Sequence, residues 1–284
     1  MVRLLILLFL FIVGCSGGTG NQLAQYNFKQ GISELSFKFL QNAPPEKLYR
    51  NSDFRIVVDA HNEMAYDLTN AKMRVVGLDN TYFELEQTEK AFGPLVGKSL
   101  LSPEGDRTFV EFDGRTKGLL PGASEYRATY FLKTNFNSLM DFSDTICINP
   151  NLYAVYDSGC SVEAQKSYGG QGAPLAVQQL EEIFTPAGNG GGMELRFTLA
   201  NRGRGKMTTV RLLKSQLGGE DLKCEFADAP LDQKTWLVLK EEEKEARLTC
   251  KTFLRDQRSY TTTLSLSFSY DYEVKDEHQL LLVK

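Results

Sequence analysis

Hydrophobic and polar residues alternate with a period of two along most of the chain, which is the pattern of β-strands buried on one face only. From Ser33 to Phe39 the apolar residues Leu35, Phe37 and Phe39 fall on one face. The clearest alternation runs from Thr263 to Tyr272, where leucine and aromatic residues take turns with Thr, Ser and Asp. No helical period persists beyond a few turns, so the pattern predicts an all-β protein.

Predicted strands fill two regions of the chain. Those of the first region are Ser33–Phe39, Phe54–Ala60, Met73–Leu78, Tyr82–Leu85, Thr108–Phe112, Tyr126–Lys133 and Ile146–Ile148. Those of the second are Ala176–Phe184, Met193–Asn201, Thr208–Leu213, Lys223–Phe226, Thr235–Leu239, Ala246–Phe253, Thr261–Tyr272 and His278–Val283. Short strands at this density, separated by turn residues, are expected of immunoglobulin-like β-sandwiches; a jelly roll is the alternative.

The strand pattern is interrupted between Cys147 and Pro174, where Asn, Gly and Pro predominate. We therefore predict a first sandwich domain over residues 31–150, an interdomain linker closed by a disulfide over 151–174, and a second sandwich domain over 175–284. The glycine-rich run from Gly169 to Pro174 is not followed by Gly-Lys-Ser/Thr or by a helical pattern, so we interpret it as an interdomain turn rather than a phosphate-binding loop.

The first residues have the form of an export signal. A positive start at Arg3 is followed by apolar residues from Leu4 to Val13, a stretch too short to span a bilayer. The sequence Ile-Val-Gly-Cys that ends at Cys15 resembles the lipobox of prokaryotic lipoproteins. It implies a signal peptide over 1–14, a lipid on Cys15, and a flexible tether over 15–30. The alternative is an ordinary cleaved signal peptide.

Cysteine usage agrees with export. Apart from Cys15, the chain has four cysteines, and an even number in an exported protein predicts two disulfides. Of the three connectivities, Cys147 to Cys160 and Cys224 to Cys250 is preferred, because each bond closes a short loop. The alternative, a four-cysteine metal site, usually requires closely spaced cysteine pairs, which this sequence lacks. We therefore predict no metal and no cofactor.

Composition and charge disfavour several classes of function. The net charge of −4 gives no basic footprint for nucleic acid, and the two histidines, His61 and His278, leave little for a catalytic triad or a histidine metal site. Acidic pairs on predicted strands, such as Glu84 with Glu86 and Glu111 with Asp113, could serve a glycan hydrolase, but a solvated strand face is the preferred interpretation. We predict no catalytic residue.

A weak internal repeat connects the two predicted domains. The strand from Phe54 ends at Asn62 and the strand from Leu195 ends at Asn201, and in each case a turn and another strand follow. Asparagine suits this position because its side chain can hydrogen-bond the turning backbone. The arrangement is similar to the CARDB-like and related immunoglobulin-like modules found in tandem in archaeal or bacterial cell-envelope lipoproteins. In the first domain Glu63-Met64-Ala65 stands where such modules have glycine. The resemblance implies two immunoglobulin-like sandwiches in tandem and a role in adhesion, assembly or spacing.

These observations predict a non-enzymatic, lipid-anchored, extracytoplasmic protein that acts as an adhesion, assembly or scaffold module. Its expected partners are the membrane, other envelope proteins and surface glycans. Loop aromatics are the candidate contacts, and Tyr153, Tyr156 and Tyr168 are the predicted partner-binding residues, although for any single loop aromatic a cap on the end of a sandwich is the preferred interpretation. The alternative function is a solute- or glycan-binding lipoprotein with its site between the domains, near residues 147–174.

Overall fold

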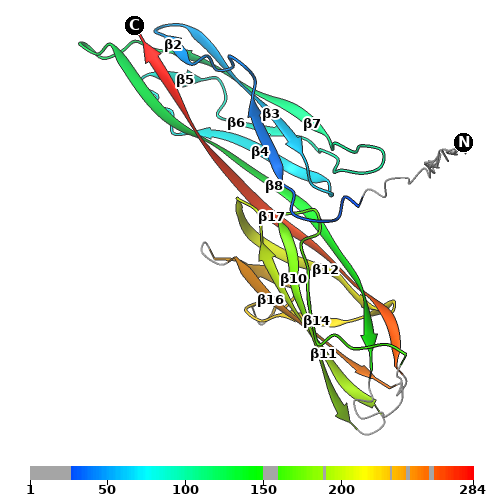
Figure 1. Ribbon diagram of the computed structural model, residues 1–284. Coiled ribbons are helices and arrows are strands. Elements are labelled where there is room, and N and C mark those ends of the chain that lie inside the picture. The colour runs from blue at the N-terminus through cyan, green and yellow to red at the C-terminus, as the bar shows by residue number, and fades with distance from the viewer. Residues whose placement is uncertain (1–26, 150–158, 188–189, 231, 241–243, 256–258) are drawn as a thin grey trace, which may run out of the picture.

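The computed structural model describes residues 27–149, 159–187, 190–230, 232–240, 244–255 and 259–284, and every helix or strand assigned in these ranges is a β-strand. The prediction of an all-β protein is therefore confirmed. Figure 1 shows an elongated molecule in which two regions of packed sheets follow one another along the long axis. The predicted signal peptide (1–14), Cys15 and most of the predicted tether lie outside the described residues.

The first sandwich pairs a four-stranded sheet with one half of an eight-stranded sheet. The four-stranded sheet has the order β1 (Leu35–Phe39), β3 (Asp53–Asn62), β7 (Arg107–Thr116), β5 (Phe83–Leu85). The other layer contains β4 (Leu68–Val76), β6 (Glu89–Phe92), β2 (Lys47–Tyr49) and parts of two long strands, β8 (Glu125–Ile148) and β17 (Tyr260–Val283).

The second sandwich pairs a five-stranded sheet with the other half of the eight-stranded sheet. The five-stranded sheet has the order β14 (Lys223–Phe226), β16 (Glu245–Leu254), β11 (Gly190–Asn201), β10 (Leu175–Ala187), β9 (Gln165–Ser167). The opposite layer contains β12 (Lys206–Leu217), β13 (Glu220–Asp221), β15 (Trp236–Val238) and the remaining parts of β8 and β17. Two sandwiches in tandem were expected, and the sheets are arranged accordingly.

The strands β8 and β17 run the length of the molecule side by side (Figure 1). Each has 24 residues, which corresponds to roughly 80 Å of extended chain. They pair antiparallel without a register shift, from Tyr260 opposite Ile148 to Val283 opposite Glu125. Even-numbered side chains of both strands face the interiors, and those from Ala128 to Phe142 on β8 are all buried. One continuous ladder is therefore part of both sandwiches.

The strand order of each sandwich is that of an immunoglobulin domain, with A-B-E-D in one sheet and C-F-G in the other. In the first sandwich these are β1-β3-β7-β5 and β4-β8-β17, and in the second they are β10-β11-β16-β14 and β12-β17-β8. Consequently β8 is strand F of the first sandwich and strand G of the second, while β17 is F of the second and G of the first. The sandwiches exchange their G strands.

The two sandwiches also share a departure from the immunoglobulin order. In both, a short strand beside strand E (β5 or β14) precedes in sequence a short strand beside strand C (β6 or β15), although in the second sandwich β13 also pairs with strand C and comes before β14. A departure common to both halves indicates that they are two copies of one topology, as the weak sequence repeat suggested.

The asparagines of the repeat make the same turn in both copies. Asn62 Oδ1 accepts the N–H two residues later at Met64 (3.1 Å), and its Nδ2 donates to the carbonyl four residues later at Tyr66 (3.0 Å). Asn201 repeats this with Gly203 (3.1 Å) and Gly205 (2.8 Å). The expectation that these side chains bond the turning backbone is confirmed.

We expect Asn62→Ala to destabilise the protein more than Asn201→Ala. Asn62 is fully buried and donates a further bond to the Leu95 carbonyl (3.0 Å), so its loss leaves several buried backbone groups unpaired. A cost of about 2–4 kcal/mol is expected for Asn62→Ala and about 1 kcal/mol for Asn201→Ala. Urea unfolding checks this, with the exposed Asn80→Ala as the neutral control; equal effects at both turns would contradict it.

The predicted domain ranges divide the chain by sequence, whereas the sheets divide it differently in space. The ranges 31–150 and 175–284 place residues 273–283 in the second domain. In the structure these residues pair with β8 in the first sandwich. Residues 139–148 of β8 pair in turn with the part of β17 that belongs to the second sandwich. The domain boundaries themselves stay a prediction, and the predicted linker (151–174) contains strand β9 of the second sandwich.

Candidate functional site

The junction between the sandwiches, here called the waist, is formed by Glu34, Tyr66, Gly172, the turn 202–205 and Tyr272. Tyr272 Oη donates to Glu34 Oε1 (2.5 Å) and accepts from the Gly205 N–H (2.7 Å). The Arg204 N–H donates to the same Glu34 oxygen (2.8 Å), and Arg204 Nε donates to the other (3.2 Å). Burial and then the hydrogen bond to Glu34 raise the pKa of Tyr272 above its usual range. Hydrogen bonds among Glu34, the turn 202–205 and Tyr272 therefore hold the waist together.

The N-terminal end of the described chain lies against the other side of the waist. Lys29 Nζ forms an ion pair with Asp141 (2.9 Å) and lies 4.9 Å from the centre of the Tyr66 ring. Tyr66 Oη donates to the Asp141 carbonyl (3.0 Å) and accepts from the Asp141 N–H (3.1 Å), so one side chain covers part of the outer edge of β8. The Gly172 N–H donates to the Gly31 carbonyl (2.8 Å). The described chain thus begins at the middle of the molecule.

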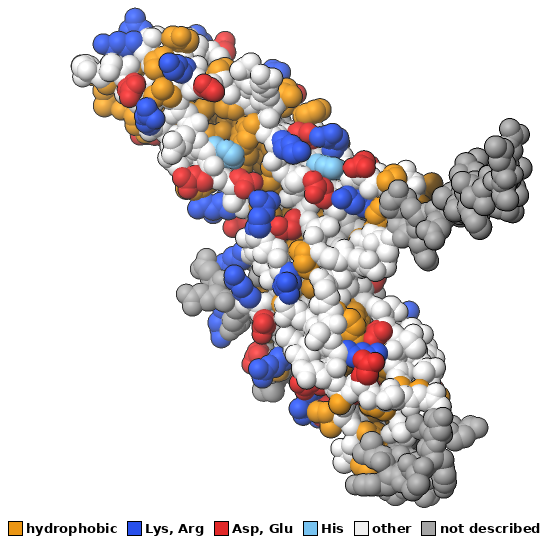
Figure 2. Space-filling model, viewed as in Figure 1, with side chains coloured by type: hydrophobic (Ala, Val, Ile, Leu, Met, Phe, Trp, Pro, Cys, Tyr) orange, Lys and Arg blue, Asp and Glu red, His pale blue; other side chains and the backbone are white. Residues whose placement is uncertain are grey.

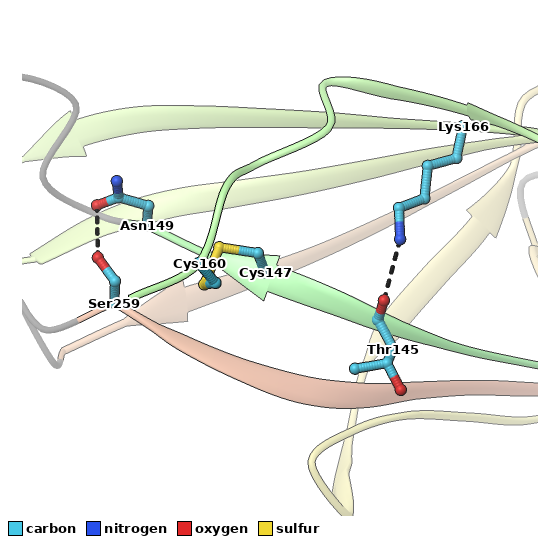
Figure 3. The surroundings of a disulfide bond; sticks show 6 residues. All are labelled: Thr145, Cys147, Asn149, Cys160, Lys166 and Ser259. Atoms are coloured by element: carbon cyan, nitrogen blue, oxygen red, sulfur yellow. Dashed lines mark hydrogen bonds between the residues drawn. A yellow bond between two sulfur atoms is a disulfide. The ribbon is translucent and has the colours of Figure 1, made fainter. Parts of the chain in front are cut away.

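Both predicted disulfides form with the preferred connectivity. Cys147, at the end of β8, is bonded to Cys160, and the ribbon in Figure 3 shows the segment after Cys160 leading back along the sandwich to Lys166. Cys224 is bonded to Cys250, its direct register partner on neighbouring strands β14 and β16. Two disulfides are typical of a chain that folds in an oxidising, extracytoplasmic compartment.

Of the three predicted partner-binding tyrosines, only Tyr168 lies within the described residues; Tyr153 and Tyr156 lie outside them. Tyr168 is half-buried, with its ring edge-on to Phe142 at 4.8 Å, and its hydroxyl donates to Asp144 (2.6 Å). Lys166 Nζ donates to the same carboxylate and to the Thr145 carbonyl, both at 3.0 Å (Figure 3 shows the second bond). Burial opposes ionisation of Asp144, but the bonds from Tyr168 and Lys166 outweigh it and lower its pKa.

Several other aromatics in or beside loops are packed against neighbouring residues. Tyr66 and Phe83 are buried, and the Tyr82 ring stacks on Tyr126 at 3.9 Å. Tyr49, by contrast, is 61% exposed.

An apolar cavity of about 290 Å³ opens beside the Cys147–Cys160 bond. It is lined by Cys147, Ile148, Asn149, Val162, Ala164, Glu182, Ile183, Phe184 and Met193. Glu182 Oε1 is buried there without a hydrogen-bond partner among the described residues, and burial raises the pKa of Glu182 from 4.5 to about 7. The sequence placed a ligand site near residues 147–174 between the domains; this cavity lies at the far end of the second sandwich.

Glu182 makes stability depend on pH in a defined direction. A carboxyl with a raised folded-state pKa holds its proton in the folded protein and loses it in the unfolded chain, so its stabilising effect is present at low pH and is lost as pH rises from 4.5 to about 7. We expect Glu182→Gln to be about 1 kcal/mol more stable than the parent at pH 8, after allowing for the exposed part of the carboxyl, and about equal at pH 4. Melting curves at both pH values check this; a gain that is the same at both would contradict it.

Three of the four acidic residues considered for catalysis, Glu84, Glu111 and Asp113, form surface ion pairs. Glu111 and Asp113 both contact Arg55, at 3.1 and 2.5 Å, and Glu84 lies 3.5 Å from Lys117. This confirms the solvated-face interpretation.

The histidines are apart from these pairs: His61 Nε2 lies 2.6 Å from the Glu104 carbonyl, while His278 packs against Phe39. Among the described residues no His, Cys, Asp and Glu side chains gather into a metal-binding group, and no helix is long and apolar enough to cross a membrane.

One exposed apolar pair was not predicted from the sequence. Leu100 and Leu101, in the loop before β7, are 76% and 99% exposed, more than any other large hydrophobic residue that the structure describes. The sequence signal is present, because the two leucines stand between Ser99 and Ser102, but a leucine pair in a loop is equally compatible with burial in a core.

No protein-family model and no curated protein matches the sequence. Among solved structures, the chain is similar to the E. coli chaperone DraB (11% identity, 77% of this chain and 86% of that chain, TM-score 0.20) and to the Salmonella enterica SafA pilin in complex with the SafB chaperone (10%, 80% and 86%, 0.22). It is also similar to part of the N-terminal region of an enterococcal surface protein (12%, 87% and 85%, 0.20). At these TM-scores the chains do not superpose as wholes, so the immunoglobulin-like assignment rests on the strand order of the two sandwiches.

Proposed function

We propose that this chain is a non-catalytic adhesion, assembly or scaffold module of the cell envelope, exported and anchored by a lipid on Cys15. The observation that carries the proposal is the ladder between β8 and β17, which passes through both sandwiches without interruption. Two domains that share a sheet are joined rigidly, whereas domains joined by a flexible linker move independently. A rigid body with two distant ends suits a spacer or scaffold that holds partners apart.

The place where the described chain begins supports anchoring at the middle of this body. Residue 27 lies next to Lys29 at the waist, and the eleven residues 16–26 could extend over roughly 40 Å. A lipid on Cys15 would then hold the waist near the membrane and leave both sandwich ends accessible to partners.

The anchor is tested by labelling cells with a radioactive lipid precursor. We expect the protein to be labelled and to fractionate with membranes, Cys15→Ala to abolish both, and the adjacent Ser16→Ala to change neither. Label that survives Cys15→Ala would refute lipid attachment at this residue.

The scaffold role is tested by photo-crosslinking on intact cells. Photoreactive residues are placed at Leu120, on a loop at the end of the first sandwich, at Phe253, near the end of the second, and at Val238, at mid-length. These positions are 55%, 57% and 53% exposed, so they are matched in access to partners. We expect discrete crosslinked species from the ends and none from Val238; crosslinking from no position would contradict the role.

The cavity beside Glu182 favours a second candidate function, the binding of a small apolar solute that carries a hydrogen-bonding group. Its volume of about 290 Å³ is at the lower limit for small-molecule sites. A thermal-shift screen would show saturable stabilisation that Met193→Trp, which fills the cavity, removes. A shift that persists in Met193→Trp would place the ligand elsewhere.

A further inference from the structure

The exposure of Leu100 and Leu101 results from a well-defined turn. The Ser99 N–H donates to the Ser102 carbonyl (3.0 Å), and the Ser102 N–H donates to Ser99 Oγ (3.1 Å), so the two leucines occupy the centre of a closed turn. The base of the loop is fixed as well, because the Lys98 N–H donates to the Met64 carbonyl (2.7 Å) and the Asp106 N–H donates to the Val96 carbonyl (3.0 Å). The bonded backbone holds both side chains in solvent.

The leucine turn lies on the side of the molecule where the described chain begins. A Cβ added to Gly97, three residues before Leu100, would lie 2.5 Å from the Tyr66 backbone nitrogen, so the loop packs directly against Tyr66. Lys29 lies over the ring of the same tyrosine. Figure 1 shows the loop before β7 on the same side of the molecule as the start of the described chain, and Figure 2 shows hydrophobic side chains beside that start.

We infer that Leu100 and Leu101 form a second membrane contact, which inserts into the lipid interface next to the anchored N-terminus. The inference rests on the proposed anchor at Cys15. The membrane is assigned as the partner of the two leucines because the described chain begins on their side of the molecule and only eleven residues, 16–26, separate it from Cys15. Two adjacent leucines that are largely exposed gain most by entering an apolar phase, and stable membrane attachment commonly combines a lipid chain with a second signal. The pair would fix which side of the body faces the lipid.

The contact is tested with the lipidated full protein in vesicles of phosphatidylethanolamine and phosphatidylglycerol with brominated acyl chains. The single tryptophan is first removed by Trp236→Phe, and a new one is introduced by Leu101→Trp or, as the control, by Leu213→Trp. Leu213 is 58% exposed on β12 in the second sandwich. We expect bromine to quench the fluorescence of Leu101→Trp and to leave that of Leu213→Trp unchanged. Equal fluorescence of Leu101→Trp in brominated and ordinary vesicles overturns the inference.

A second measurement separates this inference from the anchor. The mature chain with Cys15→Ser is mixed with the same vesicles, and its partitioning is compared with that of the further variants Leu100→Ser/Leu101→Ser and Leu213→Ser. We expect the double substitution to lower the partition coefficient roughly a hundredfold and Leu213→Ser to leave it unchanged. An unchanged coefficient for the double variant overturns the membrane contact even if Cys15 is lipidated, whereas a large loss supports the contact even if lipid labelling fails.

Discussion

A chain truncated after Tyr272 is expected to lose the first sandwich and to keep the second. Residues 273–284 supply strand G of the first sandwich, and on them Val274, Leu280 and Leu282 are buried to at least 97%. Removing three such side chains from the core costs about 5–9 kcal/mol, comparable to the whole stability of a typical domain. The second sandwich keeps strand F from the rest of β17 and strand G from β8.

Hydrogen exchange resolves the two sandwiches in the truncated chain. We expect amides of β3 and β7 to lose protection while those of β11 and β16 keep it. The matched control leaves the chain whole and replaces only outward-facing residues of the same segment, Lys275, Glu277 and Gln279, by alanine; protection should persist throughout. Native protection of β3 in the truncated chain would show that the first sandwich does not depend on the exchanged strand.

Adding the missing strand in trans sharpens the test. A peptide of residues 273–284 should restore protection in the first sandwich, because it can pair with β8 in the original register. The same peptide with Leu280→Asp and Leu282→Asp should not restore it, since each substitution places a charge in the core. If both peptides restore protection, the effect does not arise from strand pairing.

The exchange of strands explains why the sequence predicted most strands but not their continuity. On β8 the predictions stop at Lys133 and resume at Ile146, because Asn135, Asn137 and Asp141 have low strand propensity. In the structure these odd-numbered residues face outward, where polar side chains are tolerated. The residues between the two predicted pieces of β17, from Glu273 to Glu277, are mostly charged, yet Val274 is buried in the core of the first sandwich.

A usable signal for continuity was present in the composition of the long strands. Neither β8 nor β17 contains a single Gly or Pro, whereas a hairpin between strands F and G needs a turn. The sequence could not show which strand pairs with each long strand. Pairing Glu125 with Val283 joins a residue near the middle of the chain to one at its C-terminal end, and alternation alone fits many partners and registers equally well.

The candidate sites were predictable to different degrees. The disulfide connectivity followed from loop length, and the Asn62 turn followed from the known bonding of asparagine. The exposure of Leu100 and the burial of Glu182 could not be predicted, because each depends on which elements pack around the residue. A leucine in a loop and a glutamate in a strand have the same ordinary sequence context whether the side chain is exposed or buried.

Removing the Cys224–Cys250 bond is expected to be the more damaging of the two disulfide removals. The bond closes 26 residues and both cysteines are buried, at 7% and 0% exposure. Loss of the cross-link costs about 3.5 kcal/mol, and replacing both by alanine also leaves a cavity in the core of the second sandwich. The Cys147–Cys160 bond closes only 13 residues and ties an end of β8 to the segment before β9, so about 3 kcal/mol is expected for its loss.

The two double-alanine variants should therefore differ in where they unfold as well as in how far they are destabilised. In Cys224→Ala/Cys250→Ala the loss should spread through β11 and β16, which pair along most of their length. In Cys147→Ala/Cys160→Ala it should remain at the far end of the second sandwich, around β9. Hydrogen exchange and urea unfolding distinguish these patterns, with the first sandwich as the internal reference. Equal loss of protection in β3 and β16 would mean that the shared ladder transmits unfolding across the waist, and that the two sandwiches form one cooperative unit.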